Sequence, residues 1–366
     1  MLRGILDRLR EARMPWSRGR ADDAPPPRRA IRGLVLVGGG VIGGMYEVGV
    51  LAALEDGVPG FHANRFDVYV GSSAGSVVAG LMANGVPPRE LYGILDEGRE
   101  DPLNFPRGAI FHRGAAAAAA WNFAQIVWSV SKNVVTTLRL DWPEILARSQ
   151  DGMPAGFYNV AKLEQYLRMA FAARGLSNDF RACPRRLLVP AMDLDRAERV
   201  VFGDGELAAV PISEAIAASS SIPGFFEPFS IGGRDYVDGD VGHTGHADLA
   251  IGAGARALVV INPLVPLRAT DDGQPHAMRR LGLYGILEQV GRINSQNLLE
   301  GSLRELKLRD PGIRYHLIQP VPAGTPLLGP SMGFDASRAA LRFGYTSTRE
   351  WLERAGEALR EDFAAG

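Results

Sequence analysis

Short apolar runs alternate with stretches of helical spacing along the chain from Ile31 onward. The apolar runs predict buried strands over 33–37, 66–70, 186–191, 199–202, 257–261 and 315–318. Apolar residues elsewhere recur at helical spacing, which predicts helices over 45–54, 74–83, 88–99, 160–174, 212–219 and 281–308. Strands that alternate with helices are typical of an α/β protein, so we expect a mostly parallel central sheet.

Residues 1–32 differ from the rest of the chain in charge. They contain nine arginines against four acidic residues, and a run of three prolines separates their predicted helix, 2–13, from the first strand. We interpret them as a basic N-terminal appendage. Its helix either lies on a surface of anionic lipid or packs on its own domain, with fraying in solvent as a third outcome.

The segment 114–148 begins with a long uncharged stretch. Six consecutive alanines are followed by aromatic and aliphatic residues, and no charge occurs between Arg113 and Lys132. A helix this apolar must bury most of its surface. We therefore expect either a helical lid that contacts lipid or an ordinary buried helix or dimer contact.

Composition narrows the class of protein. The 366 residues carry 40 Lys and Arg against 41 Asp and Glu, a net charge of −1, so no global basic field indicates nucleic acid. Cys183 is the only cysteine, which excludes an internal disulfide and a cysteine-rich metal site. We find no secretory signal pattern and no long apolar span, and we expect a cytoplasmic protein, peripheral at a membrane where it meets lipid. Whether it forms a homo-oligomer stays open.

The glycine run Leu36-Val37-Gly38-Gly39-Gly40-Val41-Ile42-Gly43-Gly44 follows a predicted strand and precedes a predicted helix. In that position such a loop either cradles the phosphates of a nucleotide or donates backbone N–H groups to an oxyanion. The nucleotide hypothesis also requires an acidic residue about 20 positions later, at the end of the second strand. Asp56 is near that spacing, but it precedes Gly57 and Pro59 in a predicted loop, which favours the oxyanion.

A second glycine motif, Gly71-Ser72-Ser73-Ala74-Gly75, lies directly after the predicted strand 66–70 and directly before a helix. This G-x-S-x-G pattern needs small residues because the chain turns sharply there and lifts the serine into the open. The free N–H groups at the start of the helix point toward the serine oxygen. The pattern predicts Ser73 as a nucleophile.

A nucleophilic serine needs a base from elsewhere in the chain. Asp238, in Tyr236-Val237-Asp238-Gly239-Asp240, ends a predicted strand and is our first candidate, although an Asp-Gly pair is also a common turn. His243 and His246 follow closely and keep a Ser-His-Asp arrangement open as a second choice. With Asp240 and Asp248 they lack the i, i+4 placement of paired metal ligands, so we expect no metal.

Together the three motifs resemble the patatin-like phospholipase family, over roughly residues 31–263. The resemblance implies a three-layer α/β/α catalytic domain over 33–263 with a mostly helical C-terminal extension, 264–366, packed on it. It also implies a serine–aspartate dyad and no cofactor. Carried onto this chain, the dyad is Ser73 and Asp238, the oxyanion donors are Gly38, Gly39, Gly40 and Ala74, and the further motif glycines are Gly43, Gly71, Gly75 and Gly239.

The function that follows is hydrolysis of carboxylic esters in phospholipids or other acyl lipids, through an acyl-enzyme. The stretch 219–226 resembles the part of the family that lines the pocket, so Phe225, Phe226 and Phe229 are candidates for contact with the acyl chain or, equally, core residues. Two positions depart from the family pattern. Ile42 stands where many members have Arg or Lys, and Asp240 where they have Gly or Ala, which keeps a catalytically impaired lipid-binding protein as the alternative.

Overall fold

The computed structural model describes residues 30–104, 155–156, 158–267, 278–320 and 336–364, all but one of them in the unit Ile31–Gly366. The predicted helix 2–13 and the apolar segment 114–148 lie outside these residues. In the described part of the chain, no helix combines the length and the apolar character needed to cross a bilayer.

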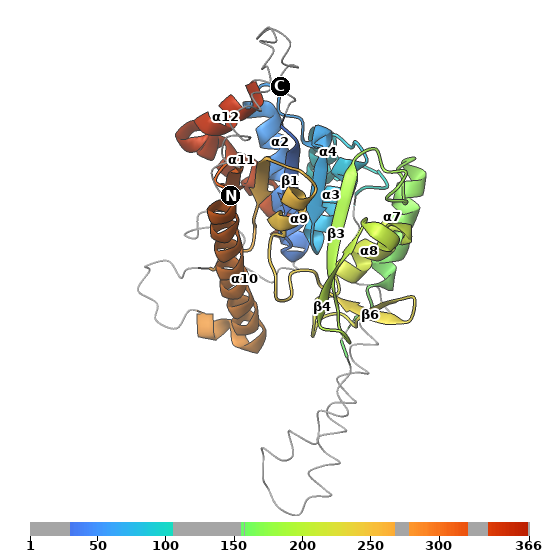
Figure 1. Ribbon diagram of the computed structural model, residues 1–366. Coiled ribbons are helices and arrows are strands. Elements are labelled where there is room, and N and C mark those ends of the chain that lie inside the picture. The colour runs from blue at the N-terminus through green and yellow to red at the C-terminus, as the bar shows by residue number, and fades with distance from the viewer. Residues whose placement is uncertain (1–29, 105–154, 157, 268–277, 321–335, 365–366) are drawn as a thin grey trace, which may run out of the picture. The chain divides into compact units, whose positions relative to one another are not determined.

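An eight-stranded mixed sheet forms the centre of the fold (Figure 1). Five strands run parallel in the order β3, β2, β1, β7, β8. At one edge, β4 and β6 pair antiparallel with β3, and β5 pairs antiparallel with β6. The strands are β1 Arg32–Leu36, β2 Val68–Gly71, β3 Arg186–Asp193, β4 Glu198–Phe202, β5 Phe229–Ile231, β6 Arg234–Val237, β7 Ala257–Ile261 and β8 Arg314–Ile318.

Helices cover both faces of this sheet, because successive side chains of a strand point to opposite faces. Leu34 and Leu36 of β1 join a core with the helices of one layer, whereas Val35 and Val37 join a second core with those of the other layer. The first layer contains α2 Gly40–Gly57, α3 Ala74–Ala83, α4 Pro88–Glu97, α7 Ala161–Ala173, α8 Ile212–Ser219 and α11 Ser337–Ala355. The second contains α9 Ala247–Gly252 and α10 Gly282–Arg309. The fold is a three-layer α/β/α sandwich.

The C-terminal part of the chain packs closely on this sandwich. Strand β8 extends the parallel sheet beside β7. Helix α11 crosses α2 where Gly49 and Gly344 face each other's helix, since a Cβ at Gly49 would lie 2.1 Å from the carbonyl oxygen of Leu341. Phe363 of α12 Glu357–Ala364 stacks on Phe61 at 4.9 Å between ring centroids. Residues well beyond the expected boundary at 263 thus share the core.

Candidate active site

Ser73 occupies the turn between β2 and α3. Its backbone has φ 49° and ψ −130°, a conformation that costs a non-glycine residue strain energy. The Ser73 N–H donates to Oγ of Ser219 at 3.0 Å, and that hydroxyl donates to the carbonyl of Pro190 at 2.7 Å. The surrounding structure therefore holds a strained serine at the carboxyl end of a parallel strand, as a G-x-S-x-G turn requires.

The glycine loop connects β1 to α2. Helix α2 begins at Gly40, five residues before the predicted start at 45, because the last glycines of the run are helical and not part of a loop. Gly39 and Gly40 have φ of 151° and 63°, a region that favours glycine. Their N–H groups, and that of Ala74 at the start of α3, make no hydrogen bond to any described residue. Three backbone donors are thus available beside the Ser73 side chain.

Asp238 follows directly after β6 and is buried, with 5% of its surface exposed. Its Oδ1 accepts the N–H of Asp240 at 2.9 Å, whereas Oδ2 accepts no hydrogen bond from a described residue. Burial raises the pKa of this carboxyl, and the neighbouring Ser73 hydroxyl lowers it in part. A Ser73–Asp238 hydrogen bond is not formed in this structure, although the two groups are close enough to interact; catalytic hydrogen bonds often tighten only when substrate binds.

Asp240 connects the three motifs. Its Oδ2 accepts the N–H of Gly38 at 3.0 Å, and its Oδ1 lies 2.7 Å from Oγ of Ser72. Burial and the negative charge of Asp238 both raise the pKa of Asp240, which favours its neutral form. The N–H of Gly38, which the sequence suggests as an oxyanion donor, is therefore already engaged. The carboxylate that departs from the family pattern fixes the glycine loop against the G-x-S-x-G turn.

The motif glycines lie where the backbone segments of the site pass close to one another. A Cβ would lie 2.4 Å from a carbonyl oxygen at Gly71 and at Gly239, and 2.5 Å from one at Gly75. At Gly43 it would lie 3.1 Å from the ring of Pro263. Any side chain at the first three positions would push apart the strands and turns that carry the site.

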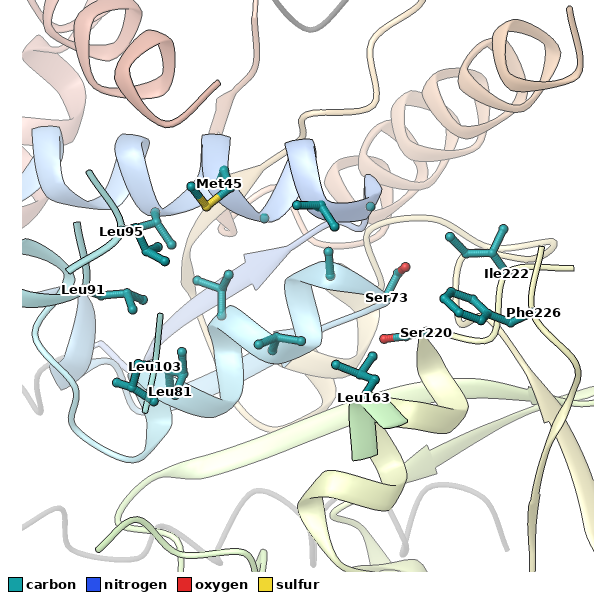
Figure 2. Close-up of a pocket in the computed structure, with 17 residues that line it drawn as sticks. Met45, Ser73, Leu81, Leu91, Leu95, Leu103, Leu163, Ser220, Ile222 and Phe226 are labelled. Carbon is teal, nitrogen blue, oxygen red and sulfur yellow. The ribbon is translucent and has the colours of Figure 1, made fainter. Parts of the chain in front are cut away.

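Two cavities meet at Ser73. The first, of about 130 Å³, is almost entirely apolar and runs between α2, α3 and α4 (Figure 2). Figure 2 shows Ile222 and Phe226 at one end of it, Ser73 and Ser220 next to them, and Leu81, Leu91 and Leu95 toward the other end. The second cavity, of about 620 Å³, lies on the side of Asp238 and Asp240 and extends to α10. Residues common to both linings are Gly40, Ser73 and Ile222.

The three candidate phenylalanines are placed differently. Phe226 lines the apolar cavity, and Phe225 lines the second cavity. Phe229 lies in β5, packs against the core, and lines neither of the two. Ile42, the other departure from the family pattern, is buried in the core, so position 42 presents no charge to either cavity.

His246 supports the loop that carries the two aspartates. Its Nε2 lies 2.9 Å from the carbonyl of Gly239, which accepts the Nε2–H, and its Nδ1 lies 3.2 Å from Arg199. Burial and the nearby positive groups lower the pKa of His246 to about 3, so the ring is neutral. Three side chains that could bind a metal lie together here: one ligand atom from each of His243, His246 and Asp248 lies within 4.8 Å of the others. However, Arg199 forms two hydrogen bonds with Asp248, so a cation would have to displace the guanidinium.

The sequence did not predict the contacts of three residues that shape the site: Ser219, Asp240 and His246. Their partners, Ser73, Gly38 and Gly239, lie in other motifs. For Ser219 the available signal was the run Ser219-Ser220-Ser221, since buried small polar residues usually bond to backbone groups. For Asp240 the signal was the unusual second acid after Asp238.

Comparisons with known proteins identify the family of the chain. The model of the family described as patatin-like phospholipase matches residues 34–251, more than half of the chain. The uncharacterized protein YqhO of Bacillus subtilis (strain 168) is 28% identical over 224 residues, which cover 57% of this chain and 62% of YqhO, so the chain spans less than two thirds of that relative. The crystal structure of VipD from Legionella pneumophila is 15% identical with a TM-score of 0.38, over 90% of this chain and 67% of VipD.

A further solved structure, the type III effector protein ExoU, is also 15% identical with a TM-score of 0.38, over 90% of this chain and 53% of that one. Because their sequence identities and TM-scores are this low, the two structures carry no argument beyond the family match. That match covers the glycine loop, the G-x-S-x-G turn and the Asp-Gly motif in one continuous segment. The chain belongs to the patatin-like phospholipase family, whose members act on lipids.

Proposed function

We propose that this protein is a lipid acyl hydrolase in which Ser73 is the nucleophile and Asp238 the general base. The observation that carries the proposal is the position of Ser73: a strained serine lines both an apolar cavity and a second cavity that contains a buried aspartate. An apolar cavity of this shape suits a fatty acyl chain, which places the ester carbonyl at the junction.

In the proposed reaction, Oγ of Ser73 attacks the ester carbonyl carbon while Asp238 takes the hydroxyl proton. The negative charge that develops on the carbonyl oxygen meets the N–H groups of Gly39, Gly40 and Ala74. The C–O bond to the leaving alcohol then breaks, and Asp238 returns the proton to that alcohol. Water, deprotonated by Asp238, attacks the acyl-enzyme and releases the fatty acid together with the regenerated serine.

Burial of Asp238 supports its role as the base. An aspartate at its usual pKa of about 3.9 is a weak base, and one with a raised pKa is a stronger base once it is ionised. The neighbouring Asp240, whose own pKa is raised further, holds its proton while Asp238 ionises. The site then carries one negative charge, beside three N–H donors that face the developing oxyanion.

Fatty-acid release from phospholipid in detergent micelles tests this function. We expect wild-type protein to release fatty acid and Ser73→Ala to reduce the rate by about 10³-fold or more, with Asp238→Asn similarly impaired. Ser230→Ala is a matched control, because Ser230 is an exposed serine of β5 that lines neither cavity. Equal release by wild type and Ser73→Ala would overturn the proposal.

A further inference from the structure

The second cavity contains a charged pair from α10, a helix beyond the residues that the family model matches. Arg292 lines this cavity, with its side chain 3% exposed, and Glu288 lines it one helical turn away. The guanidinium donates to Oε1 of Glu288 from Nε at 3.3 Å and from Nη2 at 2.9 Å, and to the carbonyl of Val265 at 3.4 Å. A buried cation therefore lies in the wall of the second cavity.

The guanidinium keeps donors that these contacts do not use. Arginine has five N–H groups, and three are engaged. The remaining two have no acceptor among the described residues. Buried donors are almost always satisfied, and the planar fork of an arginine matches the oxygens of a phosphate. A phosphate group in the cavity would supply the missing acceptors.

The charges in the cavity limit which phosphate fits. Among the described residues that line the cavity, Arg292 is one cation and Asp238, Asp240 and Glu288 are three acidic residues, so this described lining is acidic before a ligand enters. An anionic head group would add further negative charge. A zwitterionic head group adds none, and its ammonium can lie toward Glu288 while its phosphate meets Arg292.

We propose that the second cavity binds the head group of a zwitterionic, amine-bearing phospholipid, with Arg292 as its phosphate ligand and Glu288 as its ammonium ligand. This inference rests on the proposed function, because it assigns the leaving side of the same reaction. The acyl chain occupies the apolar cavity, and the head group remains attached to the glycerol that departs. Arg292 of α10 thus supplies the positive charge that the glycine loop lacks, because position 42 of the loop is Ile and not Arg or Lys.

The test compares lipids with identical acyl chains in micelles of one detergent: phosphatidylethanolamine, phosphatidylglycerol and diacylglycerol. We expect wild-type kcat/KM to be highest for phosphatidylethanolamine, by about tenfold over diacylglycerol. Arg292→Gln should lower kcat/KM about tenfold for phosphatidylethanolamine and leave kcat/KM for diacylglycerol unchanged. Arg292→Lys should lose less of the kcat/KM for phosphatidylethanolamine. Glu288→Gln should narrow the difference in kcat/KM between phosphatidylethanolamine and phosphatidylglycerol. Arg304→Gln, at an exposed arginine of the same helix, is the control.

Two results would overturn the subsite: equal wild-type rates on phosphatidylethanolamine and diacylglycerol, or an equal loss on both lipids in Arg292→Gln and Arg292→Lys. A second readout does not depend on turnover. Ligand-detected NMR should show glycerophosphoethanolamine binding to the full-length Ser73→Ala chain and not to its Arg292→Gln counterpart. Binding without hydrolysis of any lipid would support the subsite and reject the proposed function, whereas hydrolysis without this binding would do the reverse.

Discussion

The carboxylate of Asp240 accepts a hydrogen bond from the backbone N–H of Gly38 at 3.0 Å, across 202 residues of chain. The same carboxylate contacts Ser72, next to the proposed nucleophile, and the backbone N–H of Asp240 donates to Oδ1 of Asp238. One residue therefore connects the glycine loop, the G-x-S-x-G turn and Asp238. A residue that departs from the family pattern contributes to the geometry of the site.

Replacing Asp240 with the family's glycine should remove this connection. We expect Asp240→Gly to lower kcat about tenfold or more, because the glycine loop loses an acceptor that is worth roughly 1–3 kcal/mol when buried. Asp240→Asn keeps an acceptor for Gly38 and a donor for Ser72, and should stay within about threefold of wild type. Steady-state turnover of p-nitrophenyl esters measures both variants. If the glycine variant matched wild type, the hydrogen bonds of Asp240 would not be needed for turnover, and if the asparagine variant lost as much as the glycine variant, the carboxyl group itself would be required.

The pH dependence of turnover should report the raised pKa of Asp238. Since the base acts only when ionised, kcat/KM should rise with pH through a midpoint clearly above about 4, the usual range of an aspartate. The sign for stability is opposite, because a raised pKa in the folded state gives stability that is complete below about pH 4 and is lost as pH rises through the folded pKa. Rates on a soluble ester between about pH 4 and pH 8 measure the midpoint. A midpoint near 4 would show that Asp238 is solvated.

The apolar cavity should set the preferred acyl length. Leu95 of α4 lines it at a distance from Ser73 and is only half-buried (Figure 2), so a larger side chain can enter without disrupting the core. We expect Leu95→Trp to reduce turnover of long-chain esters several-fold more than that of short-chain esters. Leu308→Trp makes the same change at a leucine that is 78% exposed. A uniform loss over all chain lengths would place the acyl chain elsewhere.

His246 should make the fold sensitive to acid. Its pKa is lowered to about 3 in the folded protein from 6.5, so its stabilisation is complete above about pH 6.5 and is lost as pH falls toward the folded value. Between about pH 7.5 and pH 5, wild type should lose about 2 kcal/mol more unfolding free energy than His246→Gln, at 1.36 kcal/mol per pH unit below 6.5. Urea unfolding at both pH values measures the difference. Parallel losses in the two proteins would mean that His246 does not titrate on unfolding.

Local patterns predicted much of the fold. The predicted bounds of α3, α8 and β7 agree with the structure, because continuous apolar or small residues end there at turn residues. The hairpin of β5 and β6 was not predicted as a pair, since β5 has only three residues and its Gly232-Gly233 turn was not used as a signal. The start of α2 was predicted too late because a glycine run is normally read as a loop.

The site was less accessible to sequence reasoning, for a physical reason. Motif spacing placed Ser73 and Asp238 at the ends of strands, but it did not show that the strand before Asp238, β6, pairs antiparallel with β3. The contacts of Ser219 with Ser73 and of Asp240 with Gly38 join residues 146 and 202 positions apart, and only the packing of the sheet creates them. The second cavity depends on α10, and no sequence motif connected this helix to Ser73.

Covalent labelling of Ser73 tests the central claim most directly. Wild type, Ser73→Ala and Asp238→Asn are treated with a fluorophosphonate probe, and the modified peptide is identified by mass spectrometry. The account predicts rapid labelling of wild type at Ser73, none at that site in Ser73→Ala, and much slower labelling in Asp238→Asn. A folded wild type that remains unlabelled, or one labelled at another serine, would contradict the account and favour a catalytically impaired lipid-binding protein.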